Sequence, residues 1–292
     1  MKESERHHFI PEFFIKAFTN DNGKIFVHNK QFGKTDKISK SPKQIFFEWN
    51  RNTFKIDDYE TDFLEKVYNL GESKFSVTHR KLIEKFEPVE ITAYDILHLT
   101  LFIAEIYWRV PSQDSIASQI FQNFEEQKLL FKIKNKTTGE NIPIGKLKRL
   151  ITSKGFIGSM KKIKGLQEYL HSSKNINIKN WRIYSLPKEA PRFKIICDNP
   201  VIKRNESEDL LDSELIFPLS RGKTVFHTKG KKLKEIPADN KILIDILLFL
   251  QSEKYVASAD YDYLVSISEI SQFYNTPEKV KILKEQIFQV FD

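Results

Sequence analysis

An acid and an amide stand where an apolar run of the sequence ends. Residues 193–197 are β-favouring, and Asp198, Asn199 and Pro200 follow them directly. Because proline cannot donate to a sheet ladder and disfavours helical geometry in the residue before it, the pattern predicts that a strand stops here. A carboxylate at a strand end can act as a general base, and the amide can orient a substrate. The alternative is a plain Asx turn.

Two adjacent histidines, His7 and His8, open a predicted helix. Consecutive side chains point about 100° apart on a helix, so one can face a pocket while the other faces solvent. Histidine titrates near neutral pH and suits acid–base catalysis or metal binding. The alternative is an exposed pair at a frayed helix end. No HExxH motif is present, and the one cysteine, Cys197, excludes a zinc site with two or more cysteines from a single chain.

An opposite-charge pair lies on a nearly all-apolar stretch. Glu105 and Arg109 are four residues apart, so they are expected to pair across one helical turn. Burying both charges is costly unless both are satisfied, which gives the structural interpretation of the pair. In the functional interpretation, the planar guanidinium of Arg109 binds a phosphate or another anion.

Ser220 and Asn240 complete the candidate set. Ser220 ends an apolar run in a polar turn, and Asn240 opens a predicted helix, where it can also serve as a cap neighbour. No GxSxG motif surrounds Ser220, so a substrate-binding role is expected rather than a nucleophilic one. The sequence has no Walker A motif and no GxGxxG loop, and no organic cofactor is expected, whereas a divalent metal ion stays open.

Positive charge is concentrated in one segment of a chain whose net charge is +8. Between Lys128 and Lys164 there are eleven basic residues and one acidic residue, a net +10, so the other residues sum to −2. Such a segment attracts a polyanion through counterion release. We therefore expect Lys146, Lys148 and Arg149 to contact nucleic acid. The alternative is a solvated helical face.

The elements that must position these residues follow from the apolar pattern. Helical spacing predicts helices over residues 7–18, 57–86, 92–108, 112–134 and 144–172. A turn signal at residues 20–23 precedes a predicted strand over residues 24–28. The first 175 residues are therefore expected to be mainly helical.

Short β-type runs follow, separated by proline, glycine and charged turns. Strands are predicted over residues 181–185, 193–196, 215–219, 224–227 and 255–257, and helices over 239–252 and 277–290. The expected fold is α+β, with a largely helical N-terminal part packed against a small mixed sheet. We expect a single domain over 1–292, with 1–175 and 176–292 as candidate subdomains.

The sequence shows no signal for a membrane. No apolar run reaches the ~18 residues that span a bilayer. The first six residues lack the apolar core of a signal peptide. The expected location is the cytoplasm, and no membrane partner is expected.

Several of these segments resemble the bacterial DUF4238 family, in the order that the family has them. Residues 7–18 resemble its opening H-x-[IV]-P-x-x-[YF]-L-x-x-F, residues 25–28 its first strand, and residues 102–111 its helix that ends in Arg-x-Pro. Trp181 with residues 193–201 resembles its W…F-[IV]-T-S-D-N-P-V signature.

The resemblance continues to the end of the chain, with one departure from the pattern. Residues 217–220 resemble the family's F-P-L-S strand, and Asn240 its late asparagine. Ile196 and Cys197 stand where Thr-Ser is usual, so Cys197 must replace the serine hydroxyl in any role that it has.

The family's function is uncharacterised, so the resemblance implies no chemistry, but it groups the polar residues that match. These residues are His7, His8, Arg109, Asp198, Asn199, Ser220 and Asn240. We expect a hydrolase that acts on nucleic acid in bacterial defence against phage. Asp198 would be the base or charge stabiliser and His8 or His7 the acid or second base. Arg109 would hold phosphate, and Asn199 and Asn240 would orient the substrate.

Two reactions and two other functions stay open. Phosphodiester cleavage normally uses a metal held by several carboxylates, and Asp198 is the one clear ligand. N-glycosidic cleavage needs one carboxylate, an amide and a pocket for a flipped base. The contrasting prediction is a non-catalytic module that binds nucleic acid or protein, with the signature residues as turns and caps. A third is a hydrolase of a small phosphorylated metabolite. The sequence does not indicate the oligomeric state.

Overall fold

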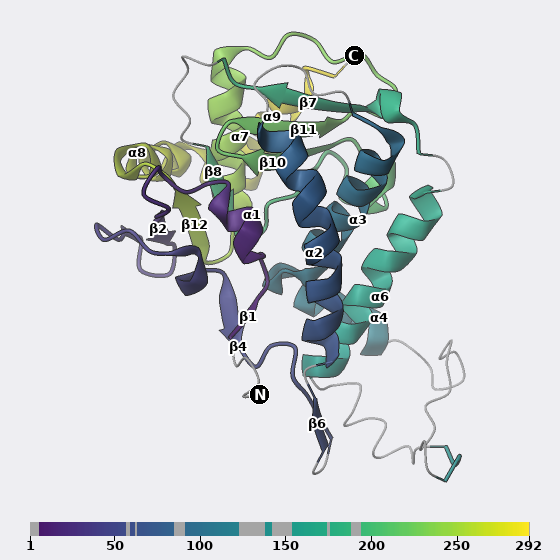
Figure 1. Ribbon diagram of the computed structural model, residues 1–292. Helices are drawn as coiled ribbons and strands as arrows, with labels where there is room; N and C mark the ends of the chain where they lie inside the picture. The colour runs from purple at the N-terminus through teal and green to yellow at the C-terminus, as the bar shows by residue number, and fades with distance from the viewer. Residues whose placement is uncertain are drawn as a thin grey trace.

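The computed structural model describes residues 6–56, 59–61, 63–84, 91–122, 138–141, 154–173, 176–187 and 194–291. Within these residues the chain is α+β, as predicted, with a helical bundle beside small sheets (Figure 1). No helix in these ranges is long and apolar enough to cross a membrane. The described strand pairs are antiparallel, so the predicted mixed sheet is wrong. A short turn joins some of these pairs, such as residues 215–220 with 223–227, and others join distant segments, such as 26–29 with 255–258.

The helical bundle packs around one central helix. It contains α2 (Phe63–Glu84), α3 (Ala93–Arg109), α4 (Asp114–Gln122) and α6 (Lys154–Ser173). Helix α3 contacts both α2 and α6. Gly165 lets α6 approach closely, because a Cβ there would lie 3.1 Å from the carbonyl oxygen of Ala104.

The prediction of a buried apolar helix is confirmed by α3. Its N-terminus is a capping box, in which the Thr92 hydroxyl accepts from the Asp95 amide and the Asp95 carboxylate accepts from the Thr92 amide. Leu99 and Ile103 are fully buried along it. The helix stops before Pro111, which places Arg109 in its last turn.

The single helix predicted over residues 7–18 is wrong. Residues Arg6–His8 form strand β1, which pairs with β4 (Phe47–Trp49), and helix α1 covers only Glu12–Lys16. Pro11 lies between them in extended geometry, with φ −59° and ψ 142°. Because a proline disfavours helical geometry in the preceding residue, the two histidines fall outside the helix and become available to a strand partner.

The helix predicted from residue 57 also begins later than expected. Strands β5 (Phe54–Ile56) and β6 (Tyr59–Thr61) pair as an antiparallel hairpin before α2 starts. The predicted helix over 112–134 is described as α4 up to Gln122, and its remainder lies outside the described residues. The helix predicted over 144–172 is described from residue 154 onward, as α6.

One sheet covers the upper part of the bundle. Its strand order is β7 (Trp181–Ser185), β11 (Lys223–His227), β10 (Leu215–Ser220) and β9 (Ile202–Lys203). Strand β10 is buried along its whole length, as its apolar sequence requires. The predicted strands 181–185, 215–219 and 224–227 are confirmed to within one residue.

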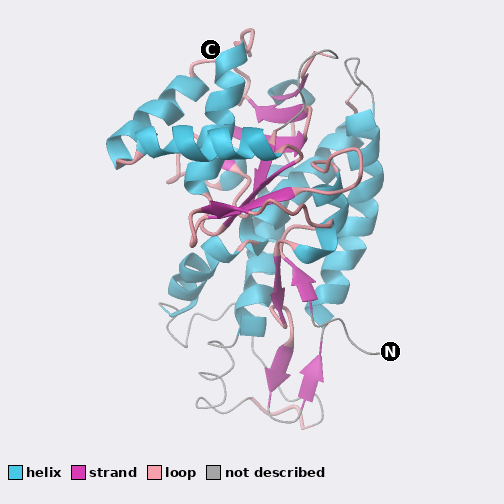
Figure 2. Cartoon of the chain, turned by 90° about the vertical axis from the view of Figure 1, so that its left-hand side faces the viewer, coloured by secondary structure: helices cyan, strands magenta, loops and turns pink. Residues whose placement is uncertain are grey.

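A second sheet joins the two ends of the chain. Its order is β3 (Lys34–Thr35), β2 (Phe26–Asn29), β12 (Tyr255–Ser258) and β8 (Ile195–Cys197). Val27 of β2 pairs with Ala257 of β12, so the sheet crosses the candidate subdomain boundary at 175. Figure 2 shows the strands in the middle of the molecule with helices on both sides.

Three helices surround the C-terminal core. They are α7 (Ala238–Gln251), α8 (Tyr261–Ser271) and α9 (Pro277–Phe288). Helix α8 is not among the predicted helices, although Asp260 caps it by accepting from the Tyr263 amide at 2.8 Å. Leu264 and Ile267, three residues apart, are its buried apolar positions.

Candidate functional site

His8 and Arg109 line one open pocket between the N-terminal strand and the helical bundle. The pocket has a volume of about 530 Å³ and is also lined by Glu12, Glu65 and Glu72. We call it the His8 pocket. An imidazole, three carboxylates and a guanidinium are therefore presented to one space, which is the composition of an acid–base site.

Strand alternation separates the two histidines. His7 is fully buried, and its Nδ1 accepts a hydrogen bond from the Asn52 amide at 2.8 Å. His8 points to the other face, toward the pocket, and its Nδ1 lies 3.9 Å from Oε1 of Glu12. The prediction that one histidine faces a pocket therefore holds for His8, whereas His7 stabilises the loop that carries Asn52.

Burial sets the protonation state of His8. Desolvation lowers the pKa of its imidazole, Glu12 opposes this shift, and the charge of Arg109 adds to it. The ring is therefore neutral at neutral pH and has a lone pair available to accept a proton. A neutral imidazole beside a carboxylate suits general-base catalysis.

Arg109 crosses from α3 to α2. Its Nη1 donates to Glu72, its Nη2 lies 3.9 Å from Oε2 of Glu65, and its Cζ lies 4.1 Å from the centroid of the Tyr68 ring. The expected pair with Glu105 is wrong, because Glu105 binds Lys162 of α6 instead. Helices α2, α3 and α6 are thus linked by ion pairs between helices rather than by one pair within α3.

The two carboxylates on α2 differ in their surroundings. Burial raises the pKa of Glu72, although the guanidinium of Arg109 opposes the shift. Oε2 of Glu65 accepts a hydrogen bond from the side-chain Nδ2 of Asn52 at 2.6 Å. Burial therefore favours the protonated form of Glu72, whereas the ion pair with Arg109 favours its charged form.

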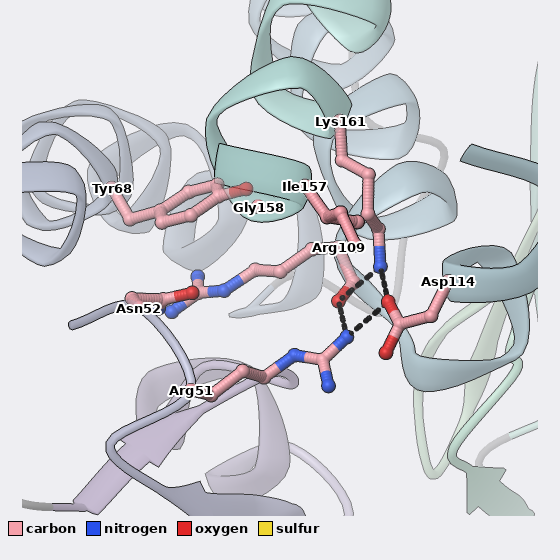
Figure 3. A pocket seen from close by; sticks show the side chains of 8 residues that line it. All are labelled: Arg51, Asn52, Tyr68, Arg109, Asp114, Ile157, Gly158 and Lys161. Atoms are coloured by element: carbon pink, nitrogen blue, oxygen red, sulfur yellow. Dashed lines mark hydrogen bonds and ion pairs between the residues drawn. The ribbon is translucent and has the colours of Figure 1, made fainter. Parts of the chain in front are cut away.

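Arg109 also lines a smaller pocket (Figure 3). It measures about 200 Å³ and is lined by Arg51, Asp114 and Lys161 among others. Lys161 donates to the Val110 carbonyl at 2.8 Å and to Asp114, and it lies 3.3 Å from the carbonyl oxygen of Arg109. Arg51 donates to Asp114 at 2.7 Å and to the same Arg109 carbonyl at 3.3 Å.

These contacts fix the end of α3. The last carbonyls of a helix have no partner within it, and cations near them are favourable. Burial and the charge of Arg51 lower the pKa of Lys161 to about 8, although Asp114 opposes the shift. The buried ammonium and Arg51 therefore hold the backbone of Arg109, and so determine where its side chain enters the His8 pocket.

The Asp198 corner lies elsewhere in the fold. The Asp198 carboxylate is buried and accepts from three successive backbone amides, Glu253 at 2.9 Å, Lys254 at 2.7 Å and Tyr255 at 2.8 Å. Burial raises its pKa, and the three amides oppose this shift. Asp198 lines neither pocket that Arg109 lines. Its surroundings therefore indicate a structural role in place of the expected catalytic one.

Asn199 belongs to the same structural corner. The side chain of Gln251, at the end of α7, donates to the Asn199 carbonyl and to the Val201 carbonyl at 3.2 Å. The Cys197 thiol also donates to the Asn199 carbonyl, at 3.1 Å. Burial raises the pKa of this thiol well above its usual range, so it stays protonated. Cys197 therefore acts as a hydrogen-bond donor within this corner.

Ser220 and Asn240 also lie outside the His8 pocket. The Ser220 hydroxyl accepts from the Gly222 amide at 3.3 Å, in the turn between β10 and β11. The Asn240 side chain donates to the Ile287 carbonyl at 3.4 Å and joins α7 to α9. Ser220 lines a separate pocket of about 140 Å³ beside Arg221 and Lys223, whereas Asn240 contributes to helix packing, and the substrate-binding roles expected for both stay predictions.

The sequence pattern of the family described as "Protein of unknown function (DUF4238)" matches residues 6–284. The chain belongs to the DUF4238 family. No curated protein and no solved structure matches it. This match confirms the predicted family membership. It includes the residues of both pockets lined by Arg109 and those of the Asp198 corner.

The basic segment of this DUF4238 chain is only partly described. Lys146, Lys148 and Arg149 lie outside the described residues, and their contact with nucleic acid stays a prediction. Lys161 and Lys162 form internal ion pairs with Asp114 and Glu105. The expected polyanion contact is therefore wrong for these two lysines, because both charges serve packing between helices.

Sequence reasoning missed the carboxylates of the pocket. Glu65, Asn69 and Glu72 follow one another at spacings of four and three residues, so they form a polar stripe on one face of α2. Glu12 follows His8 by four residues within the opening motif of the DUF4238 family. A search for polar stripes on predicted helices would have found the first group.

Proposed function

We propose that this chain is a hydrolase that acts on nucleic acid, with the His8 pocket as its active site. One observation carries the proposal: a neutral imidazole beside Glu12 shares an open pocket with Glu72, whose pKa is raised, and with Arg109. A base and an acid with pKa values shifted by their surroundings are typical of catalytic sites.

N-glycosidic hydrolysis uses these groups directly. His8 accepts a proton from water, the water oxygen bonds to the sugar carbon, and the carbon–nitrogen bond breaks. This step requires the protonated form of Glu72, which burial favours and Arg109 disfavours; Glu72 then gives its proton to the departing base, so that the atoms and charges balance. The carboxylates of Glu12 and Glu65 stabilise the positive charge that develops on the sugar. Arg109 keeps Glu72 in place and presents positive charge to a phosphate.

The acid–base groups favour this reaction over phosphodiester cleavage, which normally uses a divalent ion held by several carboxylates. Among the residues that the structure describes, no group of three or more His, Cys, Asp or Glu is arranged to hold a metal ion. Nucleic acid as the substrate is supported by the net charge of +8 and by Arg6 and Lys16 at the pocket. A cytoplasmic location and a role in defence against phage stay predictions.

The test compares His8→Asn with His98→Asn. His98 forms a hydrogen bond with the Thr78 hydroxyl and lines neither pocket that Arg109 lines, so it is a matched control. Purified variants are incubated with single-stranded and duplex DNA and RNA. Released bases are measured by mass spectrometry, and strand breaks on denaturing gels. We expect base release by the wild type and by His98→Asn, and a loss of about 100-fold or more in His8→Asn.

Two outcomes contradict the proposal. One is the absence of turnover by the wild type on all of these polymers, and the other is wild-type turnover by His8→Asn. Strand breaks in place of released bases would keep the hydrolase and replace the glycosidic reaction by phosphodiester cleavage.

The alternative is a non-catalytic binding module. It is favoured by one observation, namely that Asp198, Asn199 and Asn240 all serve as structural contacts. The module predicts binding of nucleic acid without any released product, and binding that is unaffected by His8→Asn.

A further inference from the structure

The strand that presents His8 also belongs to a ribbon with an exposed tryptophan. In the β1–β4 pair, Arg6 lies opposite Trp49 and His8 lies opposite Phe47. Because side chains alternate along a strand, Arg6, His8, Phe47 and Trp49 share one face of the ribbon. The opposite face carries His7, which is buried.

Ring contacts connect these four residues. Arg6 Cζ lies 5.0 Å from the Trp49 ring centroid and 5.1 Å from that of Phe47. The Phe47 ring lies 5.7 Å from Trp49 at 86°, and 5.7 Å from the His8 ring. A continuous row of rings therefore leads from Trp49 to the imidazole in the pocket.

Trp49 is the exposed tryptophan of the chain. It is 58% exposed, whereas the other two tryptophans, Trp108 and Trp181, are 5% and 4% exposed. Trp49 contributes little to the hydrophobic core, because more than half of its surface faces solvent. Arg6 holds it by a cation–π contact, which orders the ring while leaving much of it open.

We propose that Trp49 stacks on an unpaired base of single-stranded nucleic acid that enters the His8 pocket. An exposed aromatic ring beside cations is how proteins bind single strands, because every base has a face that can stack. Arg6 and Lys16, which line the pocket, supply the charge that phosphates require. In a duplex the faces of the bases are already stacked, so an unpaired base is needed.

The entry of the strand into the pocket rests on the proposed function, whereas stacking on Trp49 does not. The two are tested separately by binding and by turnover. Binding is followed by the quenching of tryptophan fluorescence. A bound base can contact and quench Trp49, whereas the other two tryptophans are buried and out of reach of the probe. The probes are oligothymidylate, oligouridylate, an abasic oligonucleotide of equal length and a duplex.

We expect both single strands to quench the fluorescence, and the abasic and duplex probes to leave it largely unchanged. Trp49→Ala should weaken binding of labelled oligothymidylate by about 5- to 150-fold. Trp49→Phe, which keeps a ring, should recover most of the affinity. Phe273→Ala is the matched control, because Phe273 is 72% exposed and lies in the C-terminal part of the chain.

The outcomes distinguish stacking on Trp49 from the proposed hydrolase activity. Equal affinity of Trp49→Ala and the wild type, or equal quenching by the abasic probe, overturns stacking on Trp49. Equal binding of duplex overturns the preference for single strands. If single strands quench the wild type but no product is released, the proposed hydrolase function fails and stacking on Trp49 is retained. If product is released and Trp49→Ala has no effect, stacking on Trp49 fails and the hydrolase function is retained.

Discussion

At the scale of single residues, burial determines what the histidines of this protein can do. His8 lines a pocket and its Nδ1 lies 3.9 Å from Oε1 of Glu12, whereas His79 and His227 are buried and hydrogen-bonded to the Leu219 and Ser213 carbonyls. Burial lowers the pKa of all three. Burial therefore favours the neutral imidazole at all three positions, and protonation of the two buried rings at low pH is unfavourable in the folded state.

His79 allows a quantitative prediction. Its Nε2 donates to the Leu219 carbonyl at 2.9 Å, and burial lowers its pKa to about 4. The unfolded chain binds this proton with a pKa of about 6.5, so the unfolded state gains protons first as pH falls. The stabilisation is complete above pH ~6.5, and about 3 kcal/mol of it is lost by pH ~4.

Urea unfolding at a series of pH values checks this. His79→Gln keeps a donor for Leu219 but does not titrate, so its free energy of unfolding should fall less between pH ~6.5 and pH ~4 than that of the wild type. His171→Gln, at an exposed position, should follow the wild type. Parallel curves for His79→Gln and the wild type would contradict the prediction.

At the scale of elements, the Asp198 corner is a clamp between β8, α7 and β12. The Asp198 carboxylate accepts hydrogen bonds from three backbone amides that follow α7. The Gln251 side chain, at the end of α7, donates to two carbonyls beside the corner. Lys30 donates to the Phe249 and Ser252 carbonyls at 2.8 and 2.6 Å. The helix end and the strand start are thus fixed by polar side chains. Buried polar networks of this kind are costly to break.

Asp198→Asn tests the clamp. The substitution keeps the shape of the side chain but replaces an acceptor oxygen by a donor, so at least one backbone amide loses its partner. We expect the free energy of unfolding to fall by about 2–3 kcal/mol, measured by urea denaturation. Turnover of the folded protein should be unchanged.

The matched control is Asp260→Asn, because Asp260 caps α8 and asparagine caps a helix about as well as aspartate. This variant should keep wild-type stability. Wild-type stability combined with lost turnover in Asp198→Asn would restore the catalytic role that the sequence predicted.

The sequence predicts elements whose pattern is local. Helix α3 and strands β7, β10 and β11 follow from apolar periodicity and flanking proline and glycine, so they were found within a residue or two. Strand β1 was not found, because its partner β4 lies about forty residues away and proline alone does not reveal it. The pocket was half predicted: His8 and Arg109 carry recognisable chemistry, whereas Glu72 acquires its role from a contact between helices.

At the scale of the whole molecule, the second sheet determines how the two halves depend on each other. Strand β2 from the N-terminal part lies between β3 and β12, and β12 pairs with β8. The core that contains Ile196 also contains residues of α1 and α3. Separating the chain at residue 175 would therefore expose a strand edge and an apolar face on both parts.

Unfolding of the two halves should accordingly be one transition. Cys197 of β8 is fully buried and is the one cysteine, so its reaction with a thiol reagent reports opening of the C-terminal half. Trp108 of α3 is buried in the N-terminal half. In Trp49→Phe with Trp181→Phe, Trp108 is the fluorescent reporter, and circular dichroism checks that the fold is kept. Because β2 connects the halves, thiol exposure and Trp108 fluorescence should change at the same urea concentration. Two separate midpoints would show that residues 1–175 and 176–292 unfold as independent subdomains, and would contradict the coupling through β2 and β12.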